Sequence, residues 1–258
     1  MTARKLPERV SSIAKILANR AGGYLHNTIR EPLVTCEVCT LPVDGYPRCP
    51  QCRSLLHSGA AIADRVGTMV YAEEFGSQAY KLMRAYKSSA PTQDQLDTLA
   101  GLLAVGLAGH GACVWELAGL RPVSWCTVPS LGRRDGEHPF HKLVAALPHR
   151  DGSEILVEAA EQVKDARSYR PANYVIKSPI PEGAHLLVVD DSWVTGAHAQ
   201  SVAGALKAAG AECVSILAVA RILDPNWTPN PEFIRTRLTA DYEPRICPWT
   251  GSDCPSQL

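Results

Sequence analysis

The chain has 258 residues, of which 46% are hydrophobic and 20% are charged. It is therefore long enough for one large domain with a small appendage, and this composition excludes global disorder. Lys and Arg together number 26, as do Asp and Glu. Because a chain without net charge has no overall field to hold phosphate backbones, we do not expect a nucleic acid as partner.

The N-terminal segment, from Met1 to Arg20, mixes charged residues with Ile and Leu at helical spacing. This pattern predicts a short amphipathic helix rather than a secretory signal. No stretch of the sequence approaches the roughly 20 apolar residues that span a bilayer, so we expect no membrane partner. Nine cysteines in a chain without a signal peptide indicate a reducing compartment, and we expect a cytoplasmic location.

Four of the cysteines form two C-x-x-C pairs in a segment, 32–57, that is dense in Cys and Pro. The pairs are Cys36 with Cys39 and, nine residues later, Cys49 with Cys52. Four thiolates at this spacing suit one tetrahedral zinc ion and leave no open coordination position for catalysis. The segment is too small to form a core of its own, so the sequence predicts that structural zinc holds it together.

The other five cysteines divide into two groups. Cys113, Cys126 and Cys213 lie among apolar residues and are predicted to be core residues. Cys247 and Cys254 flank a Pro-Trp-Thr-Gly sequence near the C-terminus. They could belong to a second metal site, but two ligands do not make a zinc centre.

From about residue 65 the pattern changes to short apolar strands alternating with helices. Strands are predicted at 66–71, 123–128, 186–189 and 214–220, and helices at 76–86, 94–107 and 197–209. Strands without polar alternation, separated by helices, are typical of a parallel sheet covered on both faces. We therefore expect an N-terminal helix (1–31), a four-cysteine module (32–58) and an α/β domain (59–258), with a tail that wraps the domain after Asp224.

The main functional signal is the segment 186–201, in which an apolar strand ends at Asp190 and Asp191 and a helix begins at about Ala197. Open α/β sheets bind ligands at the carboxyl ends of their strands, and the free N–H groups of a helix start bind anions. Carboxylates accept hydrogen bonds from a diol, and Gly196 allows a phosphate to approach the backbone. The pattern predicts a site for a phosphorylated ribose. In the alternative, Asp191 only caps the helix and Asp190 is simply exposed.

This segment resembles the phosphoribosyl-pyrophosphate (PRPP) signature of type I phosphoribosyltransferases, which is an apolar strand followed by two acids and a Thr-Gly loop. The matching positions are Asp190, Asp191, Thr195 and Gly196. Val194 and His198 depart from the signature. The resemblance implies that the two aspartates hold the ribose hydroxyls and are the catalytic pair, and that residues 192–198 bind PRPP. Those residues are Ser192, Trp193, Val194, Thr195, Gly196, Ala197 and His198.

The resemblance extends to the ComF-like branch of the superfamily, which carries a four-cysteine zinc module ahead of the transferase domain. Three further segments are similar to parts of that branch: helix 80–87, the pyrophosphate loop 128–134 and the stretch 167–173. They contribute the PRPP-binding candidates Lys87, Ser130, Arg133, Arg134 and Arg167. Cations are needed where the negative charge of the pyrophosphate develops, although each basic residue could instead be a solvated surface charge.

The resemblance thus implies a phosphoribosyltransferase that transfers 5-phosphoribosyl from PRPP to a nucleobase or amine and releases pyrophosphate. It implies Mg²⁺ with PRPP, structural Zn²⁺ and an unidentified small acceptor bound near 221–227, where Trp227 is a candidate stacking face. One alternative is a non-catalytic ComF-like factor that binds PRPP or assists DNA uptake. A zinc-ribbon adaptor for nucleic acids is a further alternative, which the neutral charge disfavours. A homodimer is left open.

Overall fold

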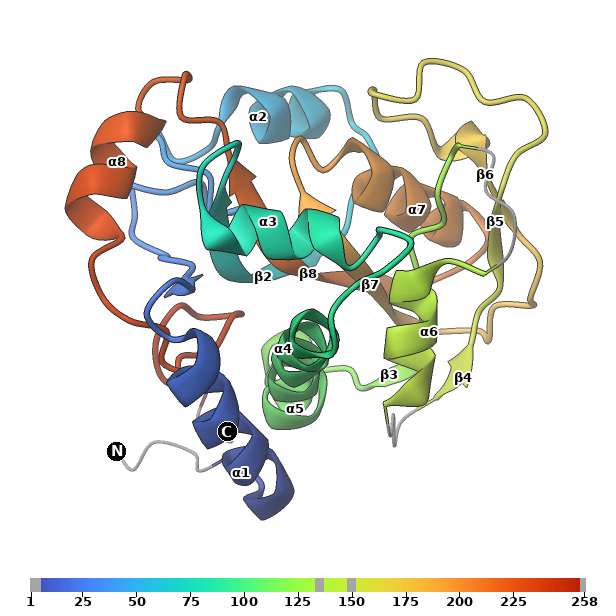
Figure 1. The fold of residues 1–258 in the computed structure, drawn as a ribbon. Helices are drawn as coiled ribbons and strands as arrows, with labels where there is room; N and C mark the ends of the chain where they lie inside the picture. Colours follow the sequence, from blue (N-terminus) through green and yellow to red (C-terminus); the bar gives the residue numbers. More distant parts are fainter. Residues whose placement is uncertain (1–5, 133–136, 148–151, 256–258) are drawn as a thin grey trace.

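The computed structural model describes residues 6–132, 137–147 and 152–255, and its centre is a six-stranded sheet, which Figure 1 shows between the helices. The strand order is β1-β2-β8-β7-β3-β4, and a separate two-stranded sheet pairs β5 with β6. In the large sheet every pairing is parallel except that of β1 with β2. The carboxyl ends of β2, β8, β7 and β3 therefore meet at one edge.

Most residues of the three central strands, β2, β8 and β7, are buried. In chain order, the strands of the two sheets are β1 (His26–Asn27), β2 (Arg65–Glu73), β3 (Pro122–Thr127), β4 (Ser153–Glu154), β5 (Val157–Ala159), β6 (Tyr174–Ile176), β7 (His185–Trp193) and β8 (Cys213–Leu223). In β8 ten of the eleven residues are buried, which explains why its sequence shows no polar alternation. Strands covered on both faces have no reason to alternate.

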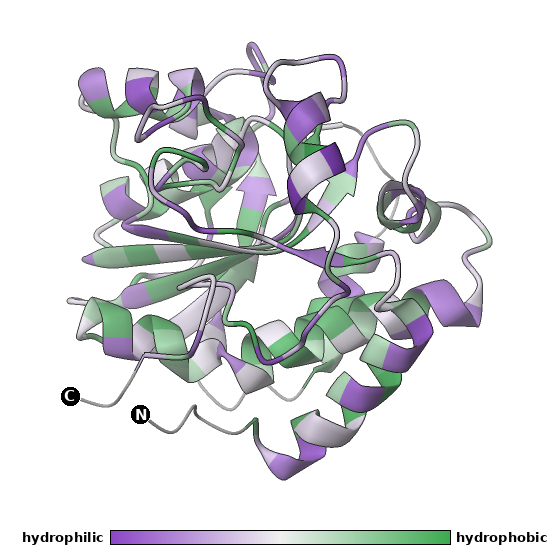
Figure 2. Cartoon of the chain, turned by 90° about the vertical axis from the view of Figure 1, so that its left-hand side faces the viewer, coloured by the Kyte–Doolittle hydropathy of each residue, from purple (hydrophilic) through white to green (hydrophobic). Residues whose placement is uncertain are grey.

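Helices cover both faces of the sheet, and Figure 2 shows the hydrophobic strands between them. The helices are α1 (Glu8–Ala21), α2 (Pro50–His57), α3 (Gln78–Ala85), α4 (Gln93–Ala104), the π-helical η1 (Val105–Gly109), α5 (Gly111–Ala118), α6 (Pro139–Ala146), the 3-10 turn η2 (Pro171–Asn173), α7 (Ala197–Ala208) and α8 (Asn230–Arg237). One core cluster contains α1, α4 and α5, and the other contains α7 and the cysteine module. Leu217 and Ile216, neighbours in β8, belong to different clusters.

One helical run among the described residues, Gln93–Ala118, is long and apolar enough to cross a membrane by length and composition. It comprises α4, η1 and α5, and 67% of its most apolar window is buried inside the protein. Leu99, Leu102 and Leu103 have no exposed surface. The run is therefore packed as a core helix, although its length exceeds what the sequence pattern led us to expect.

The α/β fold class predicted from the sequence is confirmed: a mostly parallel sheet is flanked by helices, with a four-cysteine cluster near the N-terminus. The predicted strands and helices are all present with shifted ends. The strand predicted at 186–189 continues through both acids to Trp193. The helix predicted at 94–107 changes to π geometry after Ala104. Helix α8 was missed, because its Pro- and charge-rich sequence carries little helical periodicity.

Candidate functional site

The two acids lie near the end of β7 and are still part of the extended strand. Successive side chains of a strand point to opposite faces, so the two carboxylates are separated by the sheet plane. Asp191 meets the end of α3, where Tyr86 OH donates a hydrogen bond to its Oδ2. Asp190 lies on the other face, where its charge acts on Tyr174 of β6. The pair thus offers carboxylate oxygens in two directions from one edge of the sheet.

Lys87 forms an ion pair with the second acid. Its Nζ lies 2.6 Å from Asp191 Oδ2, and Ser192 Oγ donates to Asp191 Oδ1 at 2.7 Å. Helix α3 begins at a Ser77 cap and ends just before Lys87, which fixes the position of the lysine relative to β7. The Lys87 side chain is 35% exposed. The structure therefore places this predicted residue at the acids, with its side chain partly exposed.

The two aspartates have opposite pKa shifts. Burial raises the pKa of Asp190 well above its usual value, and the neighbouring charge of Asp191 raises it further. Burial opposes ionisation of Asp191 too, but the charge and hydrogen bonds of Lys87, together with those from Tyr86 and Ser192, hold its pKa below the usual value. Two adjacent carboxyls with pKa values pushed apart are typical of functional sites.

The loop after the strand turns sharply at Gly196, which has φ +79°. A Cβ at this position would overlap the indole of Trp193, so only glycine fits. Gly196 is the N-cap of α7 and has no side chain to cap it, and Thr195 Oγ1 accepts a 3.3 Å hydrogen bond from Ala197 N. The alternative in which Asp191 caps the helix is therefore wrong. The first N–H groups of α7 lie beside exposed Thr195 and form a potential anion site.

Trp193 and Ala197 are buried, whereas Val194 is 57% exposed and Thr195 and His198 are exposed. The Trp193 side chain belongs to the core beneath the loop. Any contact of Trp193 with a ligand at the loop surface would thus come from its backbone. The exposed residues of the loop are Val194, Thr195 and His198, and Gly196 between them is buried.

A buried arginine donates hydrogen bonds to the backbone of this loop. Arg221 in β8 is 2% exposed, and its Nη1 donates to the carbonyls of Trp193, Val194 and Ile222 at 2.7, 2.8 and 2.7 Å. From the sequence, Arg221 was expected in the region of the acceptor, 221–227, and its role beneath the loop was missed. The signal was an arginine at the end of an otherwise apolar strand, because a buried cation needs dedicated partners.

Arg167 lies in a loop that docks against the start of α7. The neighbouring carbonyl of Ala166 accepts a 2.7 Å hydrogen bond from His198 Nε2, and Arg170 N donates to Ser201 Oγ at 2.7 Å. The base of the loop is closed by buried Asn173. Exposed Arg167 therefore belongs to a segment that directly contacts the 195–198 loop, which is the candidate phosphate-binding loop.

The predicted pyrophosphate loop follows β3, beside β7. Ser130 is exposed, and its Oγ accepts a 3.3 Å hydrogen bond from Gly132 N. Arg133 and Arg134 lie outside the described residues. The loop lines a cavity of about 480 Å³ that also includes Thr127 and Glu158. This places open space on the β3 side of the acidic strand.

A second cavity, of about 190 Å³, lies on the β8 side. Its walls combine the end of β8 and the phosphate-binding candidate loop with the cysteine module. They include Thr195, Arg221, Trp227 and Cys49. Trp227 is 38% exposed. Because β7 lies between β8 and β3, the acidic strand ends between the two cavities.

The four cysteines of the N-terminal module are brought together as the spacing predicts. Cys36, Cys39, Cys49 and Cys52 are buried, and their Sγ atoms all lie within 4.8 Å of one another. The Sγ atoms of Cys39 and Cys49 are 3.7 Å apart, close to the edge of about 3.8 Å that a tetrahedron with Zn–S bonds of about 2.3 Å requires. The chemistry and geometry of this set fit a closed metal site, such as one for zinc.

The module is fastened to the sheet by hydrogen bonds behind the first pair of cysteines. Tyr71 OH in β2 donates to the carbonyl of Thr40 at 2.7 Å, and Thr40 Oγ1 lies 2.8 Å from Thr68 Oγ1. Thr40 has φ +58°, which a non-glycine residue adopts only where its surroundings require it. The cysteine module is thus a fixed part of the wall beside the second cavity.

Comparison with known proteins finds no protein-family model and no curated protein that matches the chain. Among solved structures, it is similar to adenine phosphoribosyltransferase from Leishmania tarentolae (12% identity, TM-score 0.35, covering 60% of this chain and 91% of that one). It is also similar to a purine phosphoribosyltransferase from Pyrococcus horikoshii (21% identity, TM-score 0.30, covering 52% of this chain and 89% of that one). A third similar structure is orotate phosphoribosyltransferase from Mycobacterium tuberculosis (14% identity, TM-score 0.30, covering 83% of this chain and 85% of that one). These structural neighbours are thus phosphoribosyltransferases, at TM-scores of 0.30 to 0.35.

Proposed function

We propose that the chain binds PRPP with Mg²⁺ at the end of β7 and transfers its phosphoribosyl group to a small acceptor. The observation that carries this proposal is the combination of two adjacent acids with the start of α7, whose N-cap is Gly196, five residues beyond Asp191. One end of the site attracts hydroxyls and cations, and the other attracts an anion. A ribose with a 5′-phosphate offers this pairing of groups.

In this proposal the 5′-phosphate accepts hydrogen bonds from the backbone of the 195–198 loop, and Asp190 and Asp191 accept from the ribose hydroxyls. Arg167 and Lys87 contribute positive charge near the pyrophosphate, with Ser130 as a hydroxyl donor in the loop after β3. Bond cleavage at C1′ passes through an oxocarbenium-like state, so positioning and charge stabilisation suffice without a covalent intermediate.

Mg²⁺ would arrive with the substrate and offset charge on the leaving pyrophosphate. The donor set fits, because the carboxylates of Asp190 and Asp191 supply the hard oxygens that Mg²⁺ prefers. Lys87 now occupies Asp191 Oδ2. Binding of the ion at that oxygen requires the lysine to exchange its partner, and a pyrophosphate oxygen is the natural replacement.

The acceptor is proposed to enter the cavity of about 190 Å³ on the β8 side. Trp227 supplies a partly exposed indole there, and a planar base or aromatic amine would stack on it. A cytoplasmic location is part of this proposal, because PRPP chemistry and reduced cysteines both belong to that compartment.

The proposal is tested by calorimetric titration of PRPP and Mg²⁺ into zinc-loaded protein. The variant is Asp190→Asn with Asp191→Asn, and the control replaces two exposed acids remote from this edge, Glu182→Gln with Asp241→Asn. We expect saturable binding by the wild type and the control, and at least a tenfold loss of affinity in the variant. Circular dichroism verifies that each protein is folded.

Turnover is then measured as pyrophosphate release with a panel of nucleobases and amines. Release that depends on an acceptor establishes the transferase. PRPP binding without release for any acceptor would support the alternative, a non-catalytic ComF-like factor. Folded wild type that does not bind PRPP at millimolar concentration would overturn the proposed function altogether.

A further inference from the structure

The described residues contain a second cluster of metal-binding side chains, far in sequence from the first. His110, Cys113, Cys247 and Cys254 each offer one ligand atom, and these atoms all lie within 4.8 Å of one another. The first three residues have no exposed surface, and Cys254 is half-buried. Cys113 and Cys247 belong to the core cluster of α1, α4 and α5, on the opposite side of the sheet from the cysteine module.

The first half of this cluster is a His-x-x-Cys turn at the start of α5. The π-helical turn η1 interrupts the long helix and ends before His110, which leaves helical geometry with φ −115° and ψ 4°. Cys113 N then donates to the His110 carbonyl at 3.0 Å. The interruption turns both side chains to the same side, toward the C-terminal tail.

The second half is a tight turn in the tail. Cys247 N donates to the carbonyl of Ser252 at 2.8 Å, and Gly251 N donates to that of Cys247 at 2.8 Å. Gly251 has φ +73°, which favours glycine in this turn. The chain reverses there and returns Cys254 to the side of Cys247.

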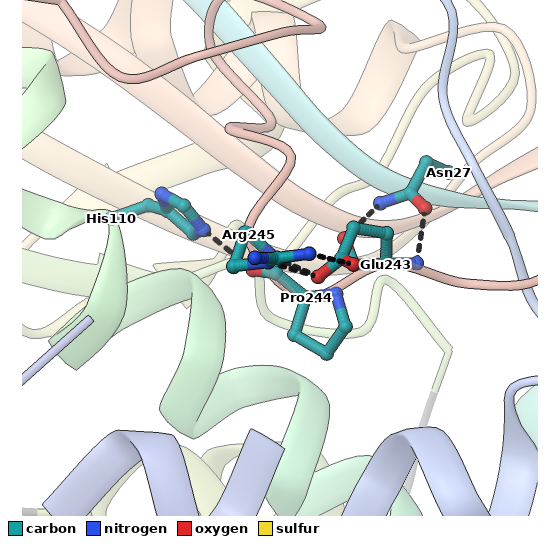
Figure 3. A network of polar contacts seen from close by, with 5 residues as sticks. All are labelled: Asn27, His110, Glu243, Pro244 and Arg245. Atoms are coloured by element: carbon teal, nitrogen blue, oxygen red, sulfur yellow. Dashed lines mark hydrogen bonds and ion pairs between the residues drawn. The ribbon is translucent and has the colours of Figure 1, made fainter. Parts of the chain in front are cut away.

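The orientation of the imidazole selects the nitrogen that would bind a metal. His110 Nε2 lies 2.9 Å from the carbonyl of Pro244, which can only accept, so Nε2 carries the hydrogen (Figure 3). Nδ1 therefore presents its lone pair to the cluster, 3.3 Å from Cys254 Sγ. Histidine ligands of metal ions usually donate their other ring N–H to a carboxylate, a water or a backbone carbonyl, as His110 does here.

We propose that these four residues bind a structural zinc ion. Three thiolates and one imidazole are a donor set that zinc prefers in closed sites. Four donors within 4.8 Å suit one ion, because a cluster of several irons would spread its ligands further apart. Each thiol gives up its proton to solvent on binding, so the ion is held by three thiolates and a neutral imidazole.

This ion would anchor a tail that has little regular structure to hold it. In the described part of the chain beyond α8, no residue is in a helix or strand. Arg30 links this tail to the first module, since its Nη1 donates to the carbonyl of Glu37 at 3.0 Å and its Nε to that of Pro248 at 3.4 Å. Glu37 and Pro248 each follow a proposed ligand directly. The two sites therefore lie on either side of one guanidinium.

The test is the metal content of the full chain, purified with thiol reductant and desalted, by mass spectrometry of the elements. Wild type is expected to hold two zinc ions, and Cys247→Ser with Cys254→Ser one. Cys213→Ser, in a half-buried cysteine outside both clusters, is the matched control and is expected to retain two. In the cobalt-substituted protein, His110→Cys is expected to retain the second ion with a visible spectrum shifted toward four-thiolate coordination.

One zinc ion in folded wild type would overturn the proposal without recourse to any variant. Two zinc ions in the Cys247→Ser, Cys254→Ser protein would also overturn it, because the second ion would then lie elsewhere. The remaining possibility is a disulfide between two of the cysteines, which a measurement of the intact mass under non-reducing conditions detects. A loss of two hydrogens that maps to Cys113 and Cys247 in freshly purified wild type would indicate a disulfide in place of the metal.

Discussion

Lys87 Nζ and Asp191 Oδ2 are 2.6 Å apart, so the ligand-free protein already neutralises one of its two adjacent acids. Among the described residues Asp190 forms no ion pair, and burial together with the charge of Asp191 raises its pKa, although the charge of Lys87 acts in the opposite direction. The pair therefore stores an unfavourable interaction that a bound cation or diol would relieve. This asymmetry sets the pH behaviour of the site.

Asp190→Asn is expected to stabilise the ligand-free protein at neutral pH by about 1 kcal/mol, a typical gain when a strained functional residue is replaced. Because the pKa of Asp190 is raised in the folded state, ionising it costs stability as pH rises from the unfolded value of about 3.9 through the folded pKa. The advantage of the variant should thus be absent near pH 4 and grow as pH rises. Urea unfolding at several pH values measures it, with exposed Asp224→Asn as control. An advantage that is independent of pH would contradict this account.

Gly196→Ala is expected to weaken PRPP binding at least tenfold and to destabilise the fold by about 1–3 kcal/mol, because alanine disfavours φ +79° and its Cβ overlaps Trp193. Gly210→Ala is the matched control: φ is +106° there, but its Cβ would meet nothing within 4 Å. It is expected to lose stability without loss of affinity. Equal effects of both substitutions on calorimetric affinity would show that the Trp193 contact is irrelevant.

Arg221→Met is expected to cost about 3 kcal/mol of unfolding free energy, because three backbone carbonyls lose a charged donor inside the protein. Arg221→Lys should recover only part of this, since an ammonium cannot reproduce the planar guanidinium. Chemical denaturation measures both, beside Arg235→Met at an exposed position. If the methionine variant were as stable as the wild type, Arg221 would not be what holds the loop.

His198→Ala is expected to loosen the loop that carries Arg167, because the hydrogen bond to Ala166 is lost. One such bond contributes about 0.5–1.5 kcal/mol, so amide hydrogen exchange in 160–173 should accelerate several-fold while global stability changes little. His57→Ala, at an exposed helix end, is the control. Unchanged exchange in 160–173 would mean that other contacts, such as that of Ser201 with Arg170, dock the loop alone.

Local patterns in the sequence were sufficient to predict the acidic strand, the Gly196 turn and the four-cysteine module, because each depends on residues close together in the chain. They were not sufficient where partners are distant. Arg221 holds the loop because β8 lies beside β7 and pairs it with Trp193. His110 meets the tail across more than 130 residues. Neither contact leaves a periodic or spaced signal that a single sequence can display.

The position of β8 has a consequence for how the chain is made. It is the last strand of the large sheet to be synthesised, yet it lies between β2 and β7. While the ribosome is still adding residues 213–223, the edges of β2 and β7 that β8 later joins have no partner and expose hydrogen-bonding groups and apolar surface. The sheet therefore cannot close before residues 213–223 have been made, and chains truncated ahead of them should be handled by chaperones or aggregate rather than fold as smaller stable units.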